Sequence, residues 1–188
     1  AALLEVQQDA LSHFSVKLAD TLQTAKSLGT VVIITNAQEG WVESSCERFL
    51  PDVLPLLESF EIVSARSSFE PQGIMVPGQW KQLAFHEVVD GFFSQLSSRL
   101  HANIVSIGDS VLEHKALLSA TAGRARCYAK SLKFCEKPSI EMLTEEHELV
   151  AGGLMEIAQH PEDLDVDVGG TFQNQADHPD EVQHGTDI

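Results

Sequence analysis

The segment NIVSIGDSVLE, residues 103–113, begins with a short apolar run and continues with polar side chains that could do chemistry. Asp109 and Glu113 are four residues apart, so both carboxylates can face one ion if a helix begins here. Carboxylate oxygens are ligands that Mg²⁺ prefers in proteins. Ser110 lies between them and could instead be the nucleophile of an esterase. The segment therefore predicts either a magnesium site or a serine nucleophile.

Two further segments supply groups that suit phosphate chemistry. The apolar run of residues 31–34 ends in Thr35 and Asn36, and Lys81 stands at the start of an amphipathic stretch, residues 80–100. A hydroxyl and nearby backbone N–H groups can bind phosphate oxygens, and a lysine can neutralise the charge that develops during phosphoryl transfer. We therefore expect Thr35, Asn36 and Lys81 to bind a phosphorylated substrate.

The elements that must position these groups alternate between short apolar runs and longer amphipathic stretches. Runs rich in β-branched residues, without polar alternation, indicate strands buried on both faces of a parallel sheet. Sites in such open sheets form beyond the carboxyl ends of the strands. The predicted class is a Rossmann-like α/β domain, with a parallel sheet and helices on both faces. The expected order is helix 2–28, strand 30–37, helix 41–58, strand 60–65, loop 66–79, helix 80–100, strand 104–107, helix 111–122, strand 125–134 and helix 139–159.

Composition limits the classes of partner and compartment. The 188 residues suit one α/β core, residues 1–158, followed by an acidic tail, residues 159–188, that we expect to be disordered. The net charge of −16 argues against sequence-independent binding to nucleic acid or to an anionic membrane. Three cysteines without zinc-type spacing indicate free thiols in a reducing, cytoplasmic compartment. The sequence contains no run of 18 apolar residues, so it predicts no membrane span.

These motifs, in this order, resemble those of the haloacid dehalogenase-like (HAD-like) hydrolase superfamily. VVIITNA is similar to the second motif, an apolar strand that ends in Thr or Ser. Lys81 matches the third motif, and IVSIGDSVLE resembles the fourth, Gly-Asp followed by another acid. The gaps of 46 residues from Thr35 to Lys81 and 28 from Lys81 to Asp109 are ordinary for the superfamily. The resemblance covers residues 1–135, and TNAQEGWVESSCERFLP, SARSSFE and WKQLAF suggest a plant- or protist-type eukaryotic branch.

The resemblance implies a Mg²⁺-dependent phosphatase that works through an aspartyl phosphate. Thr35 would bind the phosphoryl group, and Lys81 would stabilise the nucleophile and the intermediate. Asp109 with Glu113 would organise Mg²⁺. Glu113 departs from the pattern, since Asp is commoner at that place, although the longer side chain could still reach the ion. The residues do not indicate which phosphorylated compound is the substrate, or the oligomeric state.

The first motif of the superfamily, Asp-x-Asp-x-Thr, carries the nucleophile and is missing from the expected place. It should follow a strand ahead of the opening helix, but this sequence starts within that helix. We expect an N-terminally truncated, inactive core, with a gap or re-paired sheet between the strands at residues 31–35 and 104–107. A permuted first motif in LDVDVGGT, with Asp165, Asp167 and Thr171, is the alternative, although it has one residue too many before Thr.

Two other functional classes remain open. One is a non-catalytic α/β domain that binds phosphate and Mg²⁺. The other is a GDS-type esterase with Ser110 as its nucleophile, although that block normally lies on the first strand and needs a late Asp-x-x-His. A structural role also competes at Asp109, because Asp is a frequent N-cap residue of a following helix.

Overall fold

The structure of the protein is a computed structural model, which describes residues 2–97 and 100–170. Helices and strands alternate, and the paired strands are parallel, which is the predicted mixed α/β class. The elements are α1 (Ala2–Leu28), β1 (Val32–Thr35), α2 (Trp41–Phe49), α3 (Leu54–Leu57), β2 (Glu61–Ser64), α4 (Ala65–Phe69), α5 (Pro77–Gln95), β3 (Ala102–Gly108), α6 (Val111–Thr121), β4 (Cys127–Lys133), α7 (Ile140–Gln159) and β5 (Leu164–Asp167), with 3-10 turns at Pro51–Val53 and Glu70–Gln72.

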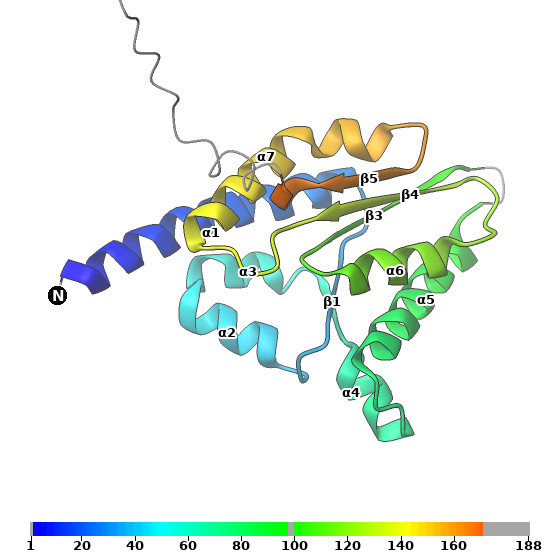
Figure 1. The fold of residues 1–188 in the computed structure, drawn as a ribbon, viewed down its shortest axis with the longest axis horizontal. Helices are drawn as coiled ribbons and strands as arrows, with labels where there is room; N and C mark the ends of the chain where they lie inside the picture. Colours follow the sequence, from blue (N-terminus) through cyan, green and yellow to red (C-terminus); the bar gives the residue numbers. More distant parts are fainter. Residues whose placement is uncertain (1, 98–99, 171–188) are drawn as a thin grey trace, which may run out of the picture.

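The strands form two separate parallel sheets. β1 pairs with β2, whereas β3 pairs with β4, which also pairs with β5. No ladder joins β1 to β3 among the residues described, so each of these two strands has one unpaired edge. The sheet is therefore interrupted where a gap was predicted. α5 packs on β1 and α6 on β3, and these two helices lie side by side and hold the sheets together (Figure 1).

Helices cover both faces of the β1–β2 sheet because successive side chains of each strand point to opposite sides. Ile33 and Ile62 contribute to a core with α2 and α3. Ile34 and Val63 pack on the other side, in a core with α4 and α5. The unbroken apolar sequence of these strands is explained by this two-sided burial.

The β3–β4–β5 sheet is also covered on both faces. α6 packs on β3 and β4, and its Leu117 is fully buried. On the other face, α7 packs around Leu132 of β4, and Ala25 of α1 joins the same core. α1 and α7 lie against one another along this side of the molecule (Figure 1).

His147 of α7 is half-buried in the contact between α1 and α7. Its ring lies edge-on between Phe14 of α1 and Phe134, with centroid distances of 5.5 and 5.1 Å. Its Nδ1 lies 3.1 Å from Thr21 Oγ1. Burial lowers the pKa of His147 to about 4, since the charged ring would lose its hydration.

Acidification is expected to destabilise the protein through His147. Because the folded pKa is depressed, the contribution to stability is fully present above the ordinary value of 6.5 and is lost as the pH falls towards about 4. The free energy of unfolding should drop by about 3 kcal/mol over this window. Urea unfolding at pH 7 and pH 4.5 measures it. The loss should be smaller in His147→Phe, and equal losses in both proteins would contradict the assignment.

The loop predicted for residues 66–79 is partly wrong, because it contains α4 and a 3-10 turn. The Ser64 hydroxyl caps α4 by accepting a hydrogen bond from the Ser67 N–H (3.1 Å). Arg66 pairs with Glu70 one turn later, at 2.8 Å. Local hydrogen bonds thus form a helix in a segment whose Ser, Pro and Gly content indicates a loop.

The prediction of a disordered tail over residues 159–188 is wrong for its first part, which is folded against the sheet. β5 lies within this segment and pairs with β4 at the edge of the sheet, and Val168 is buried in the core. The Asp163 carboxylate accepts a hydrogen bond from the Ala129 N–H (2.7 Å) and fixes the start of the strand. The remainder of the predicted tail, residues 171–188, lies outside the described residues.

Candidate functional site

Lys81 connects the carboxyl end of β1 with the start of α6. Its side chain is only 8% exposed. The Nζ atom donates a hydrogen bond to the Ile34 carbonyl of β1 (3.0 Å) and lies 2.9 Å from Glu113 Oε1 on α6. Because α6 directly follows β3, the carboxyl ends of β1 and β3 meet at this side chain.

Glu113 belongs to a capping box at the start of α6. Its carboxylate accepts hydrogen bonds from the Ser110 N–H (3.1 Å) and from the Ser110 hydroxyl, which itself accepts one from the Leu112 N–H (3.1 Å). The absence of a side chain at Gly108 lets the Glu113 side chain fold back over the end of β3, because a Cβ at position 108 would lie 2.5 Å from Glu113 Cγ. Burial acts to raise the pKa of Glu113, but Ser110 and the Lys81 ammonium outweigh it and lower that pKa. Glu113 is therefore ionised at neutral pH.

Thr35 and Asn36 lie at the end of β1, as predicted. Thr35 Oγ1 accepts a hydrogen bond from the Ala37 N–H (3.0 Å), which leaves its own O–H available to donate. The Asn36 side-chain amide donates to the Pro77 carbonyl (3.1 Å) and so braces the strand end against the start of α5. Asn36 Oδ1 is buried and has no hydrogen-bond partner within the described part of the chain.

The two predicted magnesium ligands lie in different environments. Asp109 is exposed at the end of β3 and makes no hydrogen bond or ion pair with the described residues, so its carboxylate is available to a cation. The carboxylate of Glu113 is occupied by Lys81 and Ser110. In residues 2–97 and 100–170, no group of three or more His, Cys, Asp or Glu side chains could hold a metal ion. Glu113 therefore does not fit a magnesium ligand in this arrangement, whereas the Asp109 carboxylate has no partner among the described residues.

Ser110, rather than Asp109, is the N-cap residue of α6. The partners of its hydroxyl are Glu113 and the Leu112 N–H, and neither is a histidine that could act as a base. The signal was present in the sequence, since Ser-x-x-Glu is the pattern of a capping box. The geometry gives Ser110 a structural role and does not favour the esterase alternative.

The alternative first motif at Asp165 and Asp167 lies on β5, at the outer edge of the three-stranded sheet. Asp165 Oδ1 is 3.4 Å from His114 Nδ1. β4 and β3 separate this strand from the gap beside β1, so these carboxylates are not in the gap. Thr171 lies outside the described residues.

Glu146 of α7 is a buried carboxylate that the sequence did not single out. It is fully buried, and Oε1 accepts a hydrogen bond from the Cys135 N–H (2.7 Å). Oε2 is buried without a hydrogen-bond partner among the described residues. Burial raises the pKa of Glu146, the Cys135 N–H opposes this, and the nearby charges of Asp167 and Asp109 add to the increase.

Two substitutions of Glu146 are expected to act in opposite directions. A raised carboxyl pKa means that stability falls as the pH rises from the ordinary value of 4.5 through the folded value. Glu146→Gln should therefore stabilise the protein at pH 7, with a smaller gain at pH 5. Glu146→Ala removes the acceptor of the Cys135 N–H and should cost about 1–3 kcal/mol. Thermal unfolding at the two pH values tests both, and a destabilised Gln variant would contradict the account.

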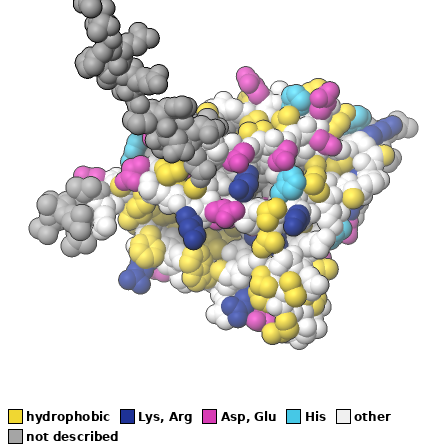
Figure 2. Space-filling view, viewed as in Figure 1, with side chains coloured by type: hydrophobic (Ala, Val, Ile, Leu, Met, Phe, Trp, Pro, Cys, Tyr) yellow, Lys and Arg dark blue, Asp and Glu magenta, His cyan; other side chains and the backbone are white. Residues whose placement is uncertain are grey.

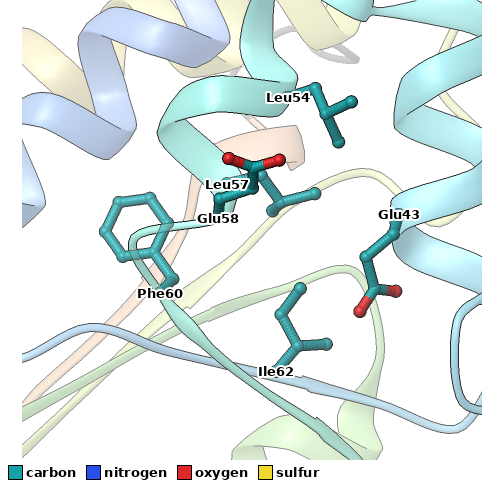
Figure 3. A pocket seen from close by; sticks show the side chains of 6 residues that line it. All are labelled: Glu43, Leu54, Leu57, Glu58, Phe60 and Ile62. Carbon is teal, nitrogen blue, oxygen red and sulfur yellow. The ribbon is translucent and has the colours of Figure 1, made fainter.

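Two cavities lie on different parts of the molecule. One, of about 240 Å³, lies between the first turns of α5 and α6. Its lining is mixed, with Gln79, Gln82 and Lys115 as its polar members. The other, of about 290 Å³, lies between α2, α3 and β2 (Figure 3).

Basic side chains do not cluster on the face of the molecule shown in Figure 2. Lys and Arg side chains there are scattered among acidic and hydrophobic ones, which gives no continuous basic patch on that face. In the part of the chain that the structure describes, no helix is both long enough and apolar enough to cross a bilayer. None of the three cysteines, all of which lie in the described residues, forms a disulfide bond.

Comparison of this chain with protein-family models, curated proteins and solved structures finds no match. The residues therefore carry the functional argument. The structure brings two predicted site residues, Lys81 and Glu113, into contact and places Thr35 and Asn36 at the adjoining strand end. Asp109 follows β3 at the same edge.

Proposed function

We propose that this chain carries the core of a HAD-like, Mg²⁺-dependent phosphohydrolase that acts on a phosphorylated substrate. The observation that carries the proposal is the position of Lys81, which links the carboxyl end of β1 to Glu113 beyond β3. A lysine held between two strand ends, in an environment that excludes most water, can stabilise negative charge that develops there.

The side chains suit distinct tasks in phosphoryl transfer. An ammonium group has three donors, and two of those of Lys81 are directed at Ile34 and Glu113, so one can reach a phosphoryl oxygen. The Thr35 hydroxyl can donate to a second oxygen, because its hydrogen bond with Ala37 uses it only as an acceptor. Glu113 keeps Lys81 oriented before substrate binds.

The nucleophile is proposed to be an aspartate on a further parallel strand between β1 and β3. Both strands have an unpaired edge there, and such a strand would end beside Thr35, Lys81 and Asp109. Mg²⁺, held in part by Asp109, would neutralise charge on the phosphoryl oxygens. Without that aspartate the chain is expected to be inactive.

Hydrolysis of p-nitrophenyl phosphate with and without Mg²⁺ tests the proposal. It is measured for this chain and for a version extended at its N-terminus by the residues encoded upstream. Activity is expected only in the extended protein and only with Mg²⁺. Activity of this chain alone would contradict the assignment of the nucleophile to an added strand.

A non-catalytic phosphate-binding domain is the second candidate. It is favoured by the occupied carboxylate of Glu113, which is ion-paired with Lys81 and capped by Ser110 rather than free for a metal. Saturable binding of phosphate by the extended protein, without turnover of any of a panel of phosphomonoesters, would support this candidate.

A further inference from the structure

The larger cavity lies on a part of the molecule that the phosphohydrolase proposal does not use. Its apolar lining comes from α3, from the turn before β2 and from β2 itself, and comprises Leu54, Leu57, Phe60 and Ile62. Its volume of about 290 Å³ is near the lower end of the range for small-molecule sites. A small ligand with an apolar part would suit it.

Two carboxylates give this cavity its charge. Glu43 reaches from the first turn of α2 towards Ile62, whereas Glu58 comes from the end of α3 (Figure 3). No ion pair or side-chain hydrogen bond of either glutamate occurs among the described residues. The lining therefore combines an apolar floor with two carboxylates that lack cationic partners.

We propose that this cavity binds an aliphatic diamine. One ammonium group lies at the Glu43 carboxylate and the other at the Glu58 carboxylate, while the methylene chain contacts the apolar floor. Alkyl chains gain from burial against Leu54, Leu57 and Ile62 in proportion to the apolar area removed from water. The net charge of −16 adds a long-range attraction for polycations.

Two basic side chains lie near the elements that line the cavity, but both have other partners. Lys26 donates a hydrogen bond to Ser59 Oγ (2.9 Å) and lies 5.7 Å from the centroid of the Phe60 ring. Arg48 lies over the Phe49 ring, 5.2 Å from its centroid. Neither residue lines the cavity, so an ammonium ligand meets carboxylates and apolar groups there.

Isothermal titration with 1,4-diaminobutane tests the proposal, with n-butylamine as the probe that has one charge fewer. The diamine is expected to bind with one-to-one stoichiometry and about tenfold or more tightly than the monoamine. Glu43→Gln and Glu58→Gln should each reduce the affinity for the diamine about tenfold, since each removes one charge-assisted contact. Both positions are exposed, so the fold should be retained.

Glu47→Gln is the matched control, because Glu47 is an exposed glutamate of α2 that does not line the cavity. It should leave diamine binding unchanged. Equal weakening by Glu47→Gln would show diffuse attraction to an acidic protein and overturn the proposal, as would equal affinity for both amines or an absence of binding. A dimer that dissociates in Glu43→Gln without any diamine binding would instead assign the cavity to a second copy of this chain.

Discussion

Lys81→Met is expected to lower the free energy of unfolding by about 3–5 kcal/mol, the cost of leaving one partner of a buried ion pair without the other. The Glu113 side chain is 15% exposed and would lose the ammonium 2.9 Å away. The Ile34 carbonyl would lose its hydrogen bond from Nζ as well. Urea unfolding at pH 7 of the wild type and the variant measures the effect.

The double variant Lys81→Met/Glu113→Gln is the control for this interpretation. Gln can still accept a hydrogen bond from Ser110, so the capping box of α6 is retained while the unpaired charge is removed. The double variant should recover part of the lost stability. A double variant less stable than Lys81→Met would show that Glu113 stabilises α6 independently of Lys81, and would contradict the coupling.

Asp109→Asn is expected to reduce Mg²⁺-dependent turnover by at least about 100-fold in the extended protein, because a carboxylate proposed to hold Mg²⁺ is lost. Its stability should be unchanged or slightly higher, since the Asp109 charge contributes to the raised pKa of Glu146. The measurements are the initial rate of p-nitrophenyl phosphate hydrolysis at several Mg²⁺ concentrations and the thermal midpoint. Loss of activity without loss of stability separates Asp109 from Lys81.

Asp167→Asn is the matched control for Asp109. Asp167 also raises the pKa of Glu146, but it ends β5 at the far edge of the sheet. Its replacement should relieve the same repulsion and leave turnover within about twofold, because β4 and β3 lie between Asp167 and the gap beside β1, where the nucleophile is proposed. Equal loss of activity in both variants would assign the effect to Glu146 and contradict a metal role for Asp109.

The strands β1 to β4 could be predicted from the sequence, whereas β5 could not. Residues 31–35 and 104–107 carry β-branched runs because both faces of β1 and β3 are covered by helices. β5 reads LDVD, and an edge strand of this kind tolerates charged side chains that face water. α4 depends on the Ser64 cap and on the Arg66–Glu70 pair, which compete with the loop signals nearby.

At the candidate site, the places of residues at the strand ends could be predicted from the sequence, but the partners of their side chains could not. Thr35 and Asp109 follow apolar runs, so their places at strand ends follow from the strand pattern itself. The pairing of Glu113 with Lys81 instead of with a metal needs the three-dimensional packing of α5 on α6. Glu146 carries no local signal, since a glutamate on an amphipathic helix is usually exposed and its burial depends on Cys135 and Gly169 folding over it.

The most direct measurement is a ¹⁵N–¹H correlation titration of this chain with inorganic phosphate in the presence of Mg²⁺. Saturable shifts confined to the amides near Thr35, Lys81 and Asp109 are expected, with weaker binding in Lys81→Met. Phosphate that shifts amides elsewhere, or shifts none, would contradict the claim that these strand ends form a phosphoryl-binding site.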